Sequence, residues 1–245
     1  MVKKFLLIFQ NRTAWRSFLK TIPLVLALFG ASYFGFSLWG TLIFLSVALA
    51  VYFSLPKDRS QIKISFWFLQ IAGLIGFTLS GATSFSALIF WGFAFLSLML
   101  ILIAHFAFRD RFLSYGIWNV LFLFLVFAEF FYFDFHHFLG AILLFLFLSL
   151  LFEEALRFFG VRWQKRILLV ALVLALLGTE IFWFTSFLPL GFVNASVFLA
   201  LCLLILRDVA LFHLQGVLTR SFIFKELTFF VALSILIFAA SKWSI

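Results

Sequence analysis

Residues 167–206 read ILLVALVLALLGTEIFWFTSFLPLGFVNASVFLALCLLIL, and this stretch decides the fold class. It contains one carboxylate, Glu180, and no lysine or arginine. It lacks the apolar–polar alternation of a β-barrel strand, and a helix needs about 20 apolar residues to cross a bilayer. The stretch therefore predicts two membrane-spanning helices joined by a turn at Pro189 and Gly191.

The whole chain has the same character. Of its 245 residues, 66% are hydrophobic and 11% are charged, against roughly 25% charged in an average soluble domain. This number of polar side chains is too small to cover the core of a soluble protein, and lipid must therefore surround most of the chain. The net charge of +9 comes from basic clusters between apolar blocks, which favours contact with anionic lipid headgroups over nucleic acid. The single cysteine, Cys202, excludes a disulfide framework, and no cofactor is predicted.

Three more stretches without lysine or arginine, at 21–56, 64–108 and 112–156, are each long enough for two crossings. A last apolar run covers 221–240. We therefore predict an all-α, polytopic transmembrane bundle of nine spans, arranged as four helical hairpins and one C-terminal helix. Turn-forming residues lie near the hairpin midpoints at Gly40, Ser80, Gly81, Gly140 and Gly191. The spans are predicted at 22–38, 41–56, 64–80, 86–107, 114–133, 138–154, 167–187, 190–206 and 221–240.

The basic residues predict the orientation. Seventeen of the eighteen lysines and arginines fall on one side of this map, which the positive-inside rule assigns to the cytoplasm. The N-terminus is then inside and the C-terminus outside. Residues 1–20 are predicted to form a basic amphipathic segment on the inner face, with 21–245 as the membrane domain, and 208–220 a separate interfacial helix. The alternative has eight spans. The expected location is the cell membrane, with a bacterial inner membrane as the host.

Residues 113–155 and 166–206 have the features of a parallel repeat. At an offset of 51, eleven of the thirty positions from Leu121 to Leu150 match those from Leu172 to Leu201. The matches include Glu129 with Glu180 and Gly140 with Gly191. We infer that the third and fourth hairpins are copies of one unit.

Glu129 and Glu180 are the first candidates for a site. Each is predicted about 10 Å below the outer surface, where a carboxylate must be protonated, paired or in contact with water. The functional interpretation is a pair that binds protons or a cationic substrate, with the amides of Asn119 and Asn194 as further polar groups in the spans. The alternative is two interfacial acids hydrogen-bonded to neighbouring helices.

A second candidate lies at the turn of the third hairpin. Asp134, His136 and His137 are ligand types that zinc and other divalent metals accept. With Glu129 these residues form the pattern Glu-x4-Asp-x-His-His. The second copy of the repeat keeps only the glutamate, Glu180. A polar turn at the water interface explains the same residues.

A third candidate lies at the inner end of the sixth span, where Glu153, Glu154 and Arg157 are followed by His213. The run Glu-Glu-Ala-Leu-Arg resembles a shortened first motif of the CAAX-type intramembrane proteases, which have one more residue before the arginine. Val209 stands where that family has a phenylalanine four residues before the histidine, and its third motif has no counterpart here. We therefore do not expect protease activity and favour an ion pair between Glu153 and Arg157.

Three functions remain after this inventory. The first is a small carrier or lipid-handling protein that uses the intramembrane carboxylates. The second is a non-catalytic scaffold whose helix faces dock another membrane protein or a second copy of the chain. The third is a membrane enzyme, which we rank last because most loops are too short to hold a catalytic domain. A wide aqueous channel is disfavoured because such pores need polar linings.

Overall fold

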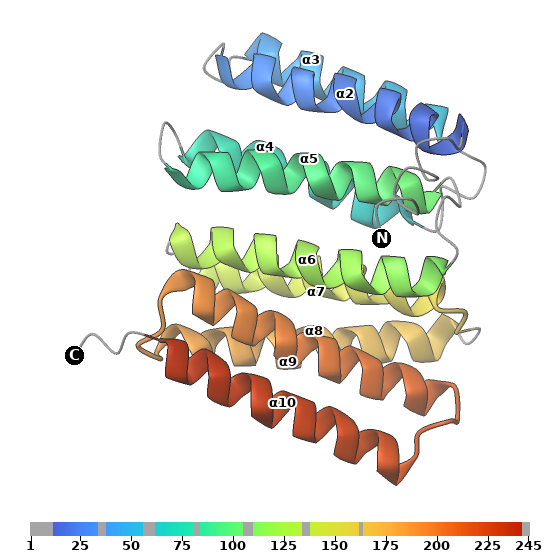
Figure 1. The fold of residues 1–245 in the computed structure, drawn as a ribbon, viewed down its shortest axis with the longest axis vertical. Helices are drawn as coiled ribbons and strands as arrows, with labels where there is room; N and C mark the ends of the chain where they lie inside the picture. Colours follow the sequence, from blue (N-terminus) through green and yellow to red (C-terminus); the bar gives the residue numbers. More distant parts are fainter. Residues whose placement is uncertain are drawn as a thin grey trace, which may run out of the picture. The chain divides into compact units, whose positions relative to one another are not determined.

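The computed structural model describes residues 12–33, 38–55, 62–80, 84–104, 110–133, 138–161 and 164–241. In these ranges all regular secondary structure is helical (Figure 1). The helices are α2 (Arg12–Tyr33), α3 (Leu38–Ser54), α4 (Lys63–Ser80), α5 (Ser84–Ala104), α6 (Arg111–Tyr132), α7 (Phe138–Phe158), α8 (Gln164–Ser186), α9 (Phe192–Leu214) and α10 (Arg220–Ala240).

Each predicted span overlaps one of these helices, which confirms the all-helical class. The first differs most, because α2 begins at Arg12 and ends at Tyr33. The basic residues from Arg12 to Lys20 therefore belong to the same helix as the first apolar run. Gly40, expected in the first turn, is instead the third residue of α3, and Gly140 is likewise the third residue of α7.

Two helices continue past the charged residues that were predicted to end them. Gly160 and Gly216 lie two residues after the last residues of α7 and α9, and their φ angles are 85° and 70°. At each end the glycine N–H and the next N–H donate to carbonyls of the last turn, the pattern of a Schellman motif. The separate interfacial helix predicted from residue 208 is therefore wrong up to Leu214, because no helix-breaking residue precedes Gly216.

The surface of these helices is apolar. Four of the described segments are long and apolar enough to cross a membrane: Arg111–Tyr132, Arg166–Ser186, Phe192–Leu214 and Arg220–Ala240. The described parts of α2 to α5 contain shorter apolar helices. No residue of α10 is buried, and its Phe224 and Leu236 side chains are 68% and 63% exposed. Large apolar side chains exposed in such numbers are typical of a membrane protein.

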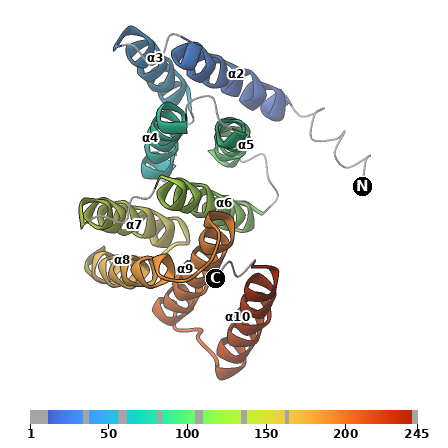
Figure 2. The same ribbon diagram turned by 90° about the vertical axis from the view of Figure 1, so that its left-hand side faces the viewer.

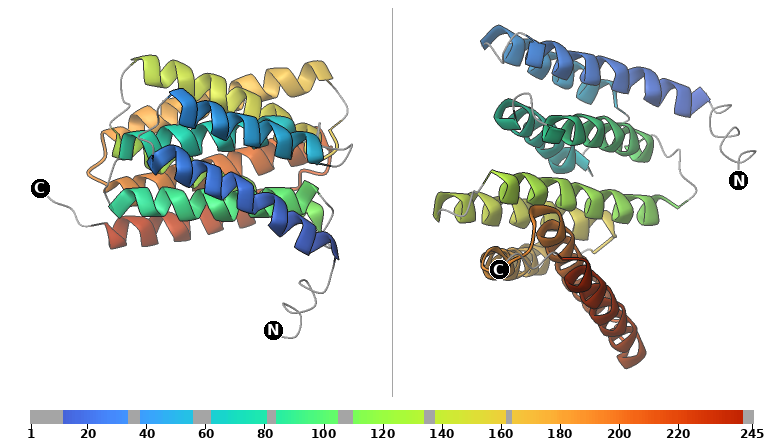
Figure 3. Two further views of the ribbon diagram at one scale, coloured as in Figure 1. Left: turned by 90° about the horizontal axis from the view of Figure 1, so that it is seen from above. Right: turned by 60° about the vertical axis from the view of Figure 1, so that its left-hand side comes forward.

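The chain forms two compact units, residues 1–122 and 123–245, with the boundary inside α6. In the first unit, α2 packs against α3 and α5, and α4 packs against α5. The ring of Phe93 on α5 contacts that of Phe44 on α3, with centroids 6.2 Å apart. In the second unit, α8 packs between α7 and α9 (Figure 2). The last helix, α10, packs against α9 (Figure 3).

Gly73 on α4 allows the close approach of α5 in the first unit. A Cβ atom at this position would lie 2.3 Å from Cδ2 of the buried Phe93 ring. We expect Gly73→Ala to lower the free energy of unfolding by about 1–3 kcal/mol, since overpacking forces a rigid ring to move. The measurement is thermal unfolding in detergent micelles. Gly30→Ala is the control, because no atom lies within 4 Å of its added methyl group. Equal melting temperatures for the two variants would contradict the expectation.

Candidate functional site

Glu129 lies in the interior of the second unit, near the outer end of α6 in the predicted orientation. Its side chain is 5% exposed, and no described residue hydrogen-bonds to its Oε1 atom. The two residues that follow it pack on α8, because the rings of Phe130 and Phe131 lie 5.9 and 4.9 Å from that of Phe182. An apolar, aromatic setting favours the uncharged acid or a carboxylate that binds a cation.

Glu180 lies at the same end of the second unit but in a different environment. Its neighbour Phe182 is fully buried against α6, and positions two apart on a helix point about 200° apart. Glu180 is accordingly exposed, on the same face as Leu176, Trp183 and Phe184, which are 52%, 44% and 63% exposed. The two acids of the predicted repeat thus lie one inside the protein and one on its apolar surface.

The two asparagines also have different settings. The Nδ2 atom of Asn194, at the start of α9, donates to Oγ of Ser241, directly after α10, at 3.2 Å. Asn194 therefore ties two helix ends together. Asn119 is fully buried in the part of α6 that belongs to the first unit, so it does not lie in the same unit as Glu129.

The residues of the inner cluster do not form a single site. Arg157 and Glu153 form the predicted ion pair one helical turn apart on α7, with 56% of the Arg157 side chain exposed. Glu154 is buried, whereas His213 is exposed in the last turn of α9. The ion pair stabilises the end of α7, and it does not involve His213.

An ion pair with a buried guanidinium, which the sequence analysis did not single out, lies nearby. Arg207 on α9 is 4% exposed, and its Nη2 atom lies 2.8 Å from Oδ1 of Asp208. Its guanidinium also lies over the ring of Phe159, 5.5 Å from the centroid. The signal was an Arg-Asp doublet at the end of a long apolar run, which we interpreted only as the end of a span.

The predicted metal ligands Asp134, His136 and His137 lie outside the described residues. Within the described ranges, no three or more histidine, cysteine, aspartate or glutamate side chains gather in a way that could hold a metal ion.

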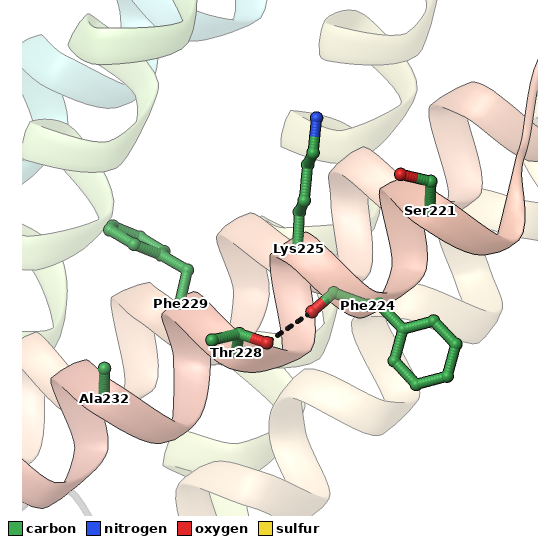
Figure 4. A pocket seen from close by; sticks show the side chains of 6 residues that line it. All are labelled: Ser221, Phe224, Lys225, Thr228, Phe229 and Ala232. Atoms are coloured by element: carbon green, nitrogen blue, oxygen red, sulfur yellow. Dashed lines mark hydrogen bonds between the residues drawn. The ribbon is translucent and has the colours of Figure 1, made fainter.

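A groove of about 540 Å³ follows one side of α10 (Figure 4). It is lined by Ser221, Phe224, Lys225, Thr228, Phe229 and Ala232. In Figure 4 the Lys225 ammonium group projects from the helix on the same side as Phe229, while the Thr228 hydroxyl donates to the Phe224 carbonyl at 2.8 Å. All six lining residues belong to α10, with one cation near the start of the helix and apolar side chains further along, so the groove is open on its other side. The sequence analysis missed this groove, although its residues recur at helical spacing.

No protein-family model, no curated protein and no solved structure matches the chain.

Proposed function

We propose that the chain is a nine-span integral membrane protein, with the N-terminus and basic loops in the cytoplasm, that acts as a small carrier or lipid-handling protein. The exposed apolar side chains of the helices support the membrane location. The grouping of seventeen of the eighteen basic residues on one side of the predicted map supports the orientation.

Cysteine labelling tests the orientation at two exposed positions. Phe187 follows α8 and is 79% exposed, and Val217 precedes α10 and is 53% exposed. In a Cys202→Ala background, Phe187→Cys should react with an impermeant maleimide added to intact cells. Val217→Cys should react only after the membrane is permeabilised. Labelling of both positions from the same side would contradict the nine-span map.

The observation that carries the carrier proposal is the Glu129 side chain. An acid with a buried oxygen that no described residue bonds is a group ready to hold a proton or a cationic headgroup. It also lies at the outer end of its helix, so a small movement could connect it to water.

The groove on α10 supports a lipid as the molecule handled. Lys225 would hold an anionic headgroup while Phe229 and Ala232 contact an acyl chain. The groove lies in the second unit, as Glu129 does.

Reconstitution tests this function. The purified protein is placed in vesicles of phosphatidylethanolamine and phosphatidylglycerol that contain trapped pyranine and a trace of fluorescently labelled phosphatidylglycerol. Pyranine reports proton entry, and dithionite quenching reports lipid movement between leaflets. We expect one of these rates to exceed that of protein-free vesicles and to be lost in Glu129→Gln. A wild-type protein indistinguishable from protein-free vesicles in both measurements would contradict the proposal.

A scaffold is the second candidate function, and the exposed faces favour it. α10 has no buried residue, and α8 presents a carboxylate, Glu180, among exposed apolar side chains. A partner helix that covers this face would remove Glu180 from lipid. If the protein is a scaffold, removal of the Glu180 carboxylate should weaken association with the partner, whereas removal of the Glu129 carboxylate should not.

A further inference from the structure

Three of the buried polar side chains of the first unit lie on three different helices, and none of them is in the unit that contains Glu129 and Glu180. They are Gln70 on α4, Ser97 on α5 and Asn119 on α6, with 0%, 2% and 0% of their surfaces exposed. The Nε2 and Oε1 atoms of Gln70 have no hydrogen-bond partner among the described residues. The same holds for the Oγ atom of Ser97.

The packing of α4 on α5 brings the first two together. Gly73 faces Phe93, and these consecutive helices run in opposite directions (Figure 1). Three residues before Gly73 is Gln70, and three residues after Phe93 is Leu96. Gln70 therefore lies opposite Leu96 and next to Ser97.

Two hydrogen bonds bring α6 to the same place. The indole N–H of Trp118 donates to the Leu96 carbonyl at 2.9 Å, and the Tyr115 and Ser65 hydroxyls lie 3.1 Å apart. Asn119 directly follows Trp118 and lies one helical turn after Tyr115. On α4, Gln70 lies slightly more than one turn after Ser65. The contacts between each pair of these three helices thus agree on one level.

The depth of this level is the same on each helix. Gln70 is seven residues from the start of α4, Ser97 seven from the end of α5 and Asn119 eight from the start of α6. At the rise of an α-helix these separations are about 10–12 Å. On the proposed topology all three ends face the cytoplasm, so the side chains lie well inside the bilayer.

We propose that Gln70 and Ser97, with Asn119 beside them, form an internal site for a small neutral molecule that donates and accepts hydrogen bonds, of which water is the smallest. Gln70 offers two donors and an acceptor, and Ser97 offers one donor and acceptor lone pairs. A metal cation would bond the oxygens but leave the Gln70 amide N–H groups without an acceptor. Buried polar groups that the protein does not satisfy are the usual place for internal water.

Water-edited solid-state NMR of the full chain in lipid bilayers tests the site. Glutamine side chains and leucine backbone amides are labelled with ¹⁵N, and the Gln70 signal is identified by its absence in Gln70→Met. We expect magnetisation to pass from water to the Gln70 amide early, and later in Ser97→Ala, which removes a group that holds the occupant. Ser46→Ala is the matched control, because the Ser46 hydroxyl already donates to the Leu42 carbonyl of its own helix at 2.7 Å.

Repeating the measurement with deuterated glycerol distinguishes two occupants of the same chemistry. Early transfer that glycerol does not change identifies water. Early transfer that glycerol suppresses shows that the site takes a larger polar molecule in place of water. Transfer to Gln70 as slow as to the amides of lipid-facing leucines, with and without glycerol, would overturn the proposal. Wild-type positions of the other signals in Ser97→Ala would show that the variant is folded.

Discussion

Glu129→Gln is expected to reduce proton or lipid movement in reconstituted vesicles to the level of protein-free vesicles. Glutamine has nearly the same size and can fill the same buried space, but it can neither release a proton nor carry a negative charge. Insertion and thermal unfolding should therefore stay close to those of the wild type. A variant that folds and has lost its activity would show that the carboxyl chemistry of Glu129 is required.

Glu180→Gln is the matched control for that result. The two acids occupy equivalent positions in the predicted repeat, but Glu180 is exposed on α8 and Glu129 is 5% exposed in α6. We expect Glu180→Gln to retain most of the activity. Full activity in Glu129→Gln would remove the carrier proposal. Loss of a co-purifying membrane protein in Glu180→Gln would favour the scaffold instead.

Asp208→Ala is expected to be the most destabilising substitution among the charged residues near the ends of α7 and α9. It leaves the buried guanidinium of Arg207 without the carboxylate that lies 2.8 Å away. Breaking a fully buried ion pair costs about 3–5 kcal/mol. Because 24% of the Asp208 side chain is exposed, water compensates part of this loss, and we expect about 2 kcal/mol. The measurement is thermal unfolding in detergent micelles.

Glu153→Ala provides the comparison for Asp208→Ala. Its ion pair with Arg157 lies near the end of α7, but 56% of the Arg157 side chain is exposed. Exposed pairs one helical turn apart contribute about 0.3–0.5 kcal/mol. The melting temperature of Glu153→Ala should therefore stay close to that of the wild type. Equal destabilisation by the two substitutions would show that burial of Arg207 does not determine the cost.

The helices could be predicted from the sequence because apolar runs between basic clusters have the length of a span. Their ends were less well predicted, since charge was used as the stop signal. Charged side chains such as Glu154 and Asp208 are compatible with helical backbone. α7 and α9 instead end just before a glycine that adopts a positive φ, Gly160 and Gly216. These two glycines would have placed the ends of α7 and α9 correctly.

The environment of each candidate residue was harder to predict. Glu129 and Glu180 have similar neighbours in the sequence, yet burial depends on which face of a helix meets another helix. That face is decided by packing over long sequence distances, such as Phe182 against Phe130 and Phe131. The level shared by Gln70, Ser97 and Asn119 depends in the same way on how three helices align. Periodicity within one helix contains none of this information.

The exposure of α10 has a consequence for its tilt. The ring of Phe198 on α9 contacts those of Phe230 and Phe238 on α10, and the ring of Phe212 contacts that of Phe222. Even so, no residue of α10 is buried. Acyl chains would then supply most of the surroundings of this helix, so bilayer thickness, rather than a protein core, would set its angle. A thinner bilayer would incline α10 further and shift the depth of Lys225 while the helices of the core stay in place.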